Sequence, residues 1–246
     1  MYIPATIQGL PVKEVRFQFY GGGTVTAVVV SDGCTSASIS GGNIKYISLP
    51  DSVTEYSGLD DTSITEFEVP ASVQVFDSEM PSTLKKISFR GTPRVIKGSF
   101  KGTKITEIVI PEGVKELGGF NDCRTLKTIT LPDSIEVLYG GAFGGCTALE
   151  VANLPANLKY IYAAGSAYAR NYNGCFADCS SLKELKIPES LTQISFCYTE
   201  TKADGSIVPS KGQNSYQYNF YHFKNCSSLP LATQARLKQL GYEGSF

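Results

Sequence analysis

Residues 126–149, LKTITLPDSIEVLYGGAFGGCTAL, contain one complete copy of a pattern that recurs along the chain. The copy opens with the apolar residues Leu126, Ile129 and Leu131 at its first, fourth and sixth positions, and Pro132 follows. Apolar side chains at alternate positions are typical of a short strand with one buried face. Pro has no N–H to donate to a ladder, so we expect the strand to end there.

Seven copies of this phrase follow one another in phase. Their first apolar residues are Ile44, Ile64, Leu84, Ile105, Leu126, Leu149 and Leu182. The copy that begins at Leu84 has Arg90 where the others have Pro, and Leu229-Pro230-Leu231 forms a degenerate eighth copy. In the second half of a copy, Phe is often followed three residues later by Cys or Thr. These pairs are Phe100/Thr103, Phe120/Cys123, Phe143/Cys146, Phe176/Cys179 and Phe223/Cys226.

The repeat predicts the architecture. A coil of about 21 residues cannot bury its apolar face alone, whereas stacked coils share a continuous core. We therefore predict a β-rich repeat solenoid, a right-handed coil of about seven or eight turns with parallel strands. At a strand spacing of roughly 4.8 Å it would be roughly 35–40 Å long. The Phe and Cys positions should form ladders, each residue resting on its equivalent one coil away.

The sequence resembles the BspA-like (Treponema pallidum type) class of leucine-rich repeat proteins. Their repeats carry L-x-x-I-x-I-P, then V-x-x-I and A-F-x-x-C, which Gly141–Leu149 and Leu126–Leu138 match almost position by position. The resemblance covers residues 44–231. It implies an extracellular or surface-attached bacterial or protist protein that binds proteins or host components, and it brings no catalytic residues. The Cys precedes the next strand by three residues, whereas common leucine-rich repeats place Asn or Cys just after the strand.

Both ends of the chain differ from the repeats. Residues 12–19 and 24–30 predict a strand–turn–strand unit within an N-terminal β-rich capping region, residues 1–43. Residues 230–241 favour a helix because Pro lies in the first turn and Gly at the exit. We expect one contiguous domain, with repeats over 44–231 and a C-terminal capping helix and tail over 232–246.

Composition excludes several classes of protein. The 246 residues carry a net charge of −1, which argues against nucleic acid as a partner. No apolar run is long enough to span a membrane. Residues 1–5 lack the features of a signal peptide, so any leader is absent from this chain. From the resemblance we expect an extracellular or cell-surface location.

We expect no catalytic, cofactor-binding or metal-binding residues. Cys123, Cys146, Cys179 and Cys226 share one repeat position, and a line of ligands does not converge on a zinc ion. Cys175 and Cys197 lie off this ladder, and the sequence leaves a disulfide between them open. His222 has no G-x-S-x-G or comparable catalytic frame around it. Glu66 and Glu68 alternate on the outward face of a strand, where charged side chains are ordinary.

Two insertions stretch the later copies, at about 162–175 and 198–221, and eight of the 14 tyrosines lie between residues 160 and 221. Insertions in a solenoid emerge as loops on one face. Tyr, Ser, Asn and Gly are also typical of binding loops. The candidate partner-binding residues are Tyr162, Tyr168, Arg170, Tyr172, Tyr198, Tyr216, Tyr218 and Tyr221. The alternative is that these tyrosines only cover the C-terminal core.

The third and fifth positions of each copy should point outward and form a second candidate surface. They are Tyr46/Ser48, Glu66/Glu68, Lys86/Ser88, Glu107/Val109, Thr128/Thr130, Val151/Asn153 and Glu184/Lys186. We therefore expect a non-enzymatic surface or secreted adhesion module that binds a protein partner through the strands and the Tyr-rich insertions. The alternative function is a carbohydrate-binding surface module that uses Tyr stacking, although the chain has no Trp.

Overall fold

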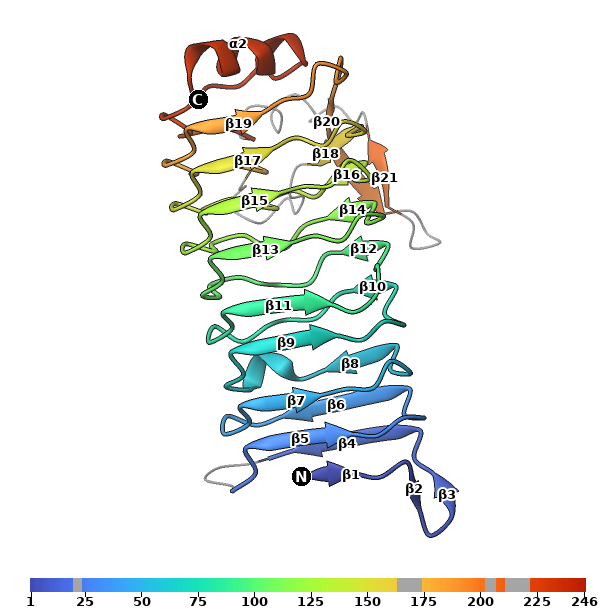
Figure 1. The fold of residues 1–246 in the computed structure, drawn as a ribbon. Helices are drawn as coiled ribbons and strands as arrows, with labels where there is room; N and C mark the ends of the chain where they lie inside the picture. Colours follow the sequence, from blue (N-terminus) through green and yellow to red (C-terminus); the bar gives the residue numbers. More distant parts are fainter. Residues whose placement is uncertain (20–23, 163–173, 202–206, 211–221) are drawn as a thin grey trace.

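The computed structural model is a parallel-strand solenoid of about seven turns, which confirms the predicted fold. It describes residues 1–19, 24–162, 174–201, 207–210 and 222–246, and in residues 196–201 and 207–210 only the backbone is described. Figure 1 shows the coils stacked in a column with the N-terminus at one end and the C-terminal α-helix at the other. The front strands run from left to right as the chain ascends, so the coil is right-handed.

Each coil contributes one strand to a front sheet and one to a rear sheet. The front strands are β1 (Tyr2–Ile3), β5 (Ala27–Val30), β7 (Tyr46–Ser48), β9 (Glu66–Val69), β11 (Lys86–Phe89), β13 (Glu107–Val109), β15 (Thr128–Thr130), β17 (Val151–Asn153) and β19 (Glu184–Lys186). The rear strands are β4 (Glu14–Gln18), β6 (Ser36–Ser40), β8 (Glu55–Ser57), β10 (Val75–Phe76), β12 (Val95–Ile96), β14 (Glu116–Leu117), β16 (Val137–Leu138), β18 (Tyr160–Tyr162) and β20 (Ser195–Thr201). Paired neighbours run parallel and in register, as Ile108 does with Ile129; β7 and β9, β11 and β13, and β8 and β10 are not paired in the described structure.

The remaining elements lie at the margins of the column. They are the hairpin β2 (Thr6–Ile7) and β3 (Leu10–Pro11), the 3-10 helix η1 (Leu59–Asp61), strand β21 (Ile207–Ser210) and helix α2 (Leu231–Gln239). Strand β21 is antiparallel to β20. Helix α2 starts after Pro230 and ends before Gly241, where φ is 104°, so the predicted helix is confirmed.

The predicted Phe and Cys ladders are present. The rings of Phe76, Phe100, Phe120, Phe143, Phe176 and Phe223 stack one above the next, with centroid separations from 4.4 to 5.8 Å. The stack ends against Tyr242 and then Phe246. This tail and helix α2 therefore close the C-terminal end of the core.

The turn after each stacked Phe explains why the residue before the ladder Cys or Thr is Gly, Asp or Asn. Gly102, Asp122, Gly145, Asp178 and Asn225 all have positive φ, between 56° and 76°. The left-handed region is open to Gly and, among other residues, is visited mainly by Asn and Asp. The repeat therefore places one of these three residues at the position where the chain turns toward the next front strand.

The N-terminal segments form strands, although β4 and β5 do not lie side by side. Strand β4 pairs in parallel with β6 in the rear sheet, and β5 pairs in parallel with β1 and β7 in the front sheet. The two segments thus lie on opposite sides of one coil, because coiling already begins there. The division into a cap over 1–43, repeats over 44–231 and a C-terminal cap over 232–246 stays a proposal.

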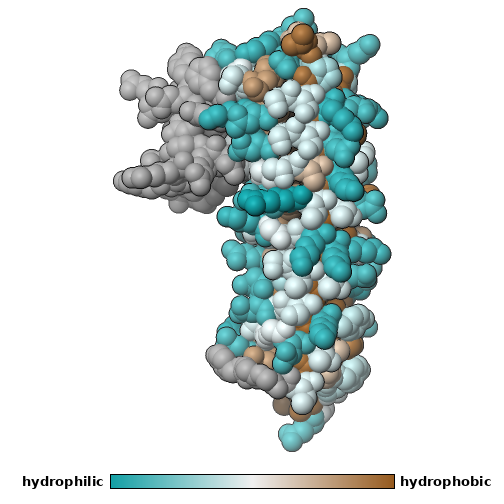
Figure 2. Space-filling model, turned by 90° about the vertical axis from the view of Figure 1, so that its left-hand side faces the viewer, coloured by the Kyte–Doolittle hydropathy of each residue, from teal (hydrophilic) through white to brown (hydrophobic). Residues whose placement is uncertain are grey.

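Figure 2 shows the side of the column where the turns before the front strands stack. A pale strip runs the length of the column between rows of hydrophilic side chains. Hydroxyl groups in these turns donate to the carbonyl of the coil below, as Thr83 does to Ile64 at 2.7 Å and Thr125 to Ile105 at 2.8 Å. This side is therefore occupied by bonds between coils.

Candidate functional site

The ladder cysteines are structural groups. The Sγ atoms of Cys123, Cys146, Cys179 and Cys226 each donate to the carbonyl of a Phe in the neighbouring coil, at 3.0 to 3.2 Å. Burial raises the pKa of Cys226 to about 12, so this thiol stays protonated at neutral pH. The thiolate is the nucleophilic form of cysteine, and a protonated buried thiol is inert.

Three cysteines, Cys34, Cys175 and Cys197, lie outside the ladder. Cys34 is buried and its Sγ donates to the Ser36 carbonyl at 3.1 Å. Cys175 is a buried free thiol. The side chain of Cys197 lies outside the described residues. Among the residues that are described, no group of three or more His, Cys, Asp and Glu side chains is arranged to hold a metal ion.

His222 is completely buried beneath the last coil. Its Nδ1 accepts a hydrogen bond from the Cys175 backbone N–H at 3.2 Å. Burial lowers the pKa of His222 to about 3, because the charged form cannot be solvated there. His222 is therefore neutral at physiological pH and fixes the backbone of the preceding coil.

The candidate tyrosines in the insertions are only partly described. Tyr162 is 6% exposed, and its ring lies 5.8 Å from that of Tyr139 and 5.9 Å from that of Tyr160. The backbone of Tyr198 pairs with Ser210, while its side chain lies outside the described residues. Tyr168, Arg170, Tyr172, Tyr216, Tyr218 and Tyr221 also lie outside them. Their role in partner binding stays a prediction.

The outward side of the front strands is the surface that the structure describes in full. We call it the strand face and define it by the third and fifth residues of the copies from β7 to β19. Those residues are exposed or half-buried, while the residue between them is buried, as Phe67 is between Glu66 and Glu68. Val109 is 83% exposed on β13, the most exposed of the large apolar side chains described. The repeat already placed Val109 at an outward position, where every other copy has a polar residue.

Three depressions lie along the strand face. One of about 380 Å³ lies over β7, β9 and β11, and one of about 920 Å³ over β11, β13 and β15. A third of about 360 Å³ lies over β15, β17 and β19. The first two coincide with breaks in the front sheet, since β7 does not pair with β9 in the described structure, nor β11 with β13.

The break between β7 and β9 is bridged by Arg90. Its guanidinium donates to the Leu49 carbonyl and lies 3.0 Å from an Asp51 oxygen and 3.5 Å from a Glu68 oxygen. The Arg90 backbone N–H donates to the Val69 carbonyl at 3.0 Å, a bond that Pro could not make. In the copy that lacks Pro, the side chain of Arg90 therefore holds three coils together.

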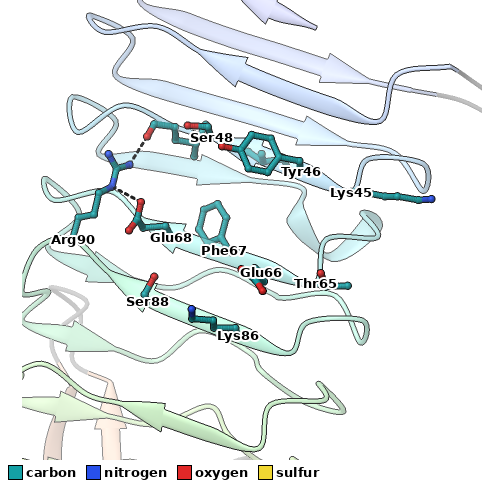
Figure 3. Close-up of a pocket in the computed structure, with 12 residues that line it drawn as sticks. Lys45, Tyr46, Ser48, Thr65, Glu66, Phe67, Glu68, Lys86, Ser88 and Arg90 are labelled. Carbon is teal, nitrogen blue, oxygen red and sulfur yellow. Dashed lines mark hydrogen bonds and ion pairs between the residues drawn. The ribbon is translucent and has the colours of Figure 1, made fainter.

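We call the depression over β7, β9 and β11 the seam groove, and Figure 3 shows its lining. Tyr46, Glu66 and Lys86 succeed one another from strand to strand, as do Ser48, Glu68 and Ser88. Phe67 forms part of the floor. The repeat pattern predicted that the side chains at the third and fifth positions face outward. It did not predict the groove, because the break in strand pairing has no signature in the repeat.

No helix in the described part of the chain is long and apolar enough to cross a membrane. A family model described as the BspA type leucine rich repeat region matches residues 19–119 and 172–242, in six copies. The described residues between the two matched ranges, 120–162, continue the same Phe and Cys ladders.

Solved structures of bacterial leucine-rich repeat proteins are similar to this chain at low identity. One from T. pallidum is 22% identical, with 100% of this chain and 84% of that chain covered and a TM-score of 0.39. A leucine rich cell surface protein from Faecalibacterium prausnitzii A2-165 is 18% identical, with a TM-score of 0.39, and the alignment covers 90% of this chain and 64% of that chain. A leucine-rich repeat protein from Bacteroides ovatus ATCC 8483 is 17% identical over 100% of this chain and 82% of its own, with a TM-score of 0.37. A comparison with curated proteins finds no match.

Proposed function

This chain belongs to the BspA-type leucine-rich repeat family, and from that premise we propose that it is a non-enzymatic module that binds a protein partner through its strand face. Such repeat families are typical of protein-interaction surfaces. We further propose an extracellular or cell-surface location and a role in adhesion, as the family implies. The Tyr-rich insertions, where Tyr168, Tyr216 and Tyr218 lie, would extend the binding surface beyond the strands.

The observation that carries the proposal is the exposed apolar side chain of Val109. It is the most exposed apolar side chain of the strand face, and it lines the larger of the two depressions that lie at breaks in the front sheet. Pro111 and Pro132 line the same depression. A small apolar centre surrounded by polar groups is the arrangement in which protein interfaces concentrate their binding energy.

Two buried groups support a role without catalysis. His222 is neutral and enclosed, and the ladder thiols are occupied by hydrogen bonds to carbonyl groups. Glu66 and Glu68 lie on an open surface, and Glu68 is engaged by Arg90. These residues serve the packing of the coils or line a shallow groove.

The test is a Val109→Glu variant, which puts a charge at the centre of the proposed interface. The matched control is Val75→Glu, because Val75 is 50% exposed on rear strand β10, away from the strand face. Both proteins are screened by biolayer interferometry against a panel of purified extracellular-matrix and cell-surface proteins. We expect V109E to weaken binding of a panel protein at least about tenfold and V75E to leave it unchanged. Equal binding by both variants, or the absence of any binder, would contradict the proposal.

A further inference from the structure

The seam groove lies where the front sheet is interrupted. On the regular coils, strands lie roughly 4.8 Å apart and their outward side chains pack side by side. Between β7 and β9 the strand pairing is absent from the described structure, and a depression of about 380 Å³ takes its place. Pockets that hold small ligands begin at about this size.

Tyr46 supplies an aromatic platform at this groove. Its side chain is 56% exposed and lines the groove, and Figure 3 shows the face of its ring turned outward from β7. The face of an aromatic ring carries negative charge density and attracts electropositive C–H groups. A ring presented in this way fits the flat, C–H-rich side of a pyranose.

The polar groups around Tyr46 combine donors and acceptors in balance. Glu66 and Lys86 are register neighbours on β9 and β11, at the end of the groove where the strands begin. Ser48, Glu68 and Ser88 line the other end. Carboxylates accept hydrogen bonds, ammonium groups donate them and hydroxyls do both, which is the complement of a polyol.

The charge of the groove favours a neutral ligand. Three cationic side chains, Lys45, Lys86 and Arg90, are balanced by the carboxylates of Glu66, Glu68 and Asp51. Arg90 already contacts two carboxylates and the Leu49 carbonyl, so it is not available to capture an anion as a bidentate partner. Its ion pair with Glu68 instead restrains that carboxylate, which lowers the ordering cost of binding.

We propose that the seam groove is a binding site for a neutral saccharide, with one pyranose stacked on Tyr46 and its hydroxyls bonded to Glu66, Lys86 and Ser48. The site goes beyond the protein-binding function proposed above and uses a different part of the strand face, centred on β7 and β9. It involves neither the tyrosines of the insertions nor Val109.

The experiment measures binding of neutral hexasaccharides by isothermal titration calorimetry: maltohexaose, cellohexaose, laminarihexaose, mannohexaose and chitohexaose in its fully N-acetylated form. We expect at least one to bind the full chain. Tyr46→Ala should weaken that binding at least about tenfold, and Tyr46→Phe should retain it, because the ring alone makes the stacking contact. Glu66→Gln, which keeps the shape of the side chain, should weaken it severalfold.

The matched control is Tyr2→Ala, since Tyr2 is 68% exposed on β1 and does not line the groove. It should leave saccharide binding unchanged. Far-UV circular dichroism and the melting temperature of each variant establish that the solenoid is intact; Tyr46 points outward, so its loss should change neither. Heparin is included as a polyanion, and varying the salt concentration identifies binding driven by surface charge.

The proposal is overturned if none of the five hexasaccharides binds, if Y46A binds as the unchanged protein does, or if Y2A loses as much affinity as Y46A. Binding of heparin alone would also overturn it. These outcomes do not bear on the proposed protein-binding function, because that function is tested by the binding of protein ligands to V109E and V75E. A peptide or protein that loses affinity in Y46A but not in V109E would reassign the groove to a protein partner.

Discussion

The coils from Phe100 to Leu229, which we call the regular stack, differ from the coils between Ile44 and Arg90, which we call the seam region. In the regular stack the rings of Phe100, Phe120, Phe143, Phe176 and Phe223 lie one above another, and the front strands β13 to β19 form one continuous sheet. In the seam region the front sheet divides at β7 and β9 and the rear sheet at β8 and β10.

The difference lies in what joins one coil to the next. Identical positions in successive coils produce ladders, in which each residue rests on its equivalent one coil away. Arg90 departs from the repeat, and the strands near it are held by a side chain in addition to backbone pairing. A hollow of about 380 Å³ lies over the interruption between β7 and β9, and another of about 360 Å³ lies over the paired strands β15, β17 and β19. Four predictions test this contrast.

The largest effect should come from removing a ring of the regular stack. Phe120 is completely buried, and its centroid lies 4.4 Å from that of Phe100 and 5.8 Å from that of Phe143. Phe120→Ala should lower the free energy of unfolding by about 3–5 kcal/mol. Phe89→Ala is the matched control in the seam region: its ring is half-buried and 6.0 Å from Phe76, so the loss should be roughly half as large. Equal losses in urea unfolding would mean that stacking adds nothing to the stability of the regular stack.

The next effect concerns His222 at the end of the regular stack. Unfolded His titrates at about 6.5, whereas burial lowers the pKa of folded His222 to about 3. Between these values the unfolded state binds more protons, so stability should fall as the pH decreases, by about 1.4 kcal/mol per pH unit. His222→Asn keeps a side-chain acceptor for the Cys175 N–H and should remove this slope. If the stability of the unchanged protein and that of H222N vary in parallel between pH 6.5 and 4.5, His222 does not have the lowered pKa.

A smaller effect is expected where Arg90 bridges the seam region. Arg90→Ala removes the bond to the Leu49 carbonyl and the ion pairs with Asp51 and Glu68, and should cost about 1–2 kcal/mol, since the partners are partly exposed. Arg90→Lys should recover only part of this, because it lacks the planar fork. Arg94→Ala, which breaks an exposed pair with Glu116, serves as the control and should cost less than about 0.5 kcal/mol. If the free energy of unfolding of R90A equals that of R94A, the coils of the seam region do not depend on the Arg90 bridge.

The smallest effect comes from an ion-pair ladder on the rear of the regular stack. Glu136 accepts hydrogen bonds from Lys159 and Lys115, on the coils above and below it, and these hold its pKa below the usual value. The stabilisation is present above the unfolded pKa of about 4.3 and is lost as the pH falls through the lower folded pKa. Glu136→Gln should therefore be less stable at pH 7 by less than about 1 kcal/mol. The difference should vanish in strong acid, and a difference that persisted there would point to a packing effect of the substitution.

The sequence predicted the front strands of the coils, the two ladders and the terminal helix, because each depends on residues at fixed spacing; it did not predict the rear strands of the repeats. Phe120 and Cys123 could be assigned to ladders from the recurrence of their positions alone. The N-terminal segments 12–19 and 24–30 could be identified as strands, but their placement in opposite sheets could not, since a strand pattern does not name its partner. The tyrosines of the insertions stay a prediction.

The seam groove marks the limit of the pattern, whereas the outward orientation of Val109 was predicted from its position in the repeat. Outward positions in a repeat carry no burial constraint, so their residue types say little about what lies beside them. Arg90 was visible as a departure from Pro, yet its contacts with Leu49, Asp51 and Glu68 join residues up to 41 positions apart. By itself the sequence determined that the chain coils and what fills its core, because burial of apolar side chains repeats with every coil. The tertiary structure alone decided where the strand pairing breaks and a surface hollow forms, because that depends on contacts between coils which no single copy of the repeat encodes.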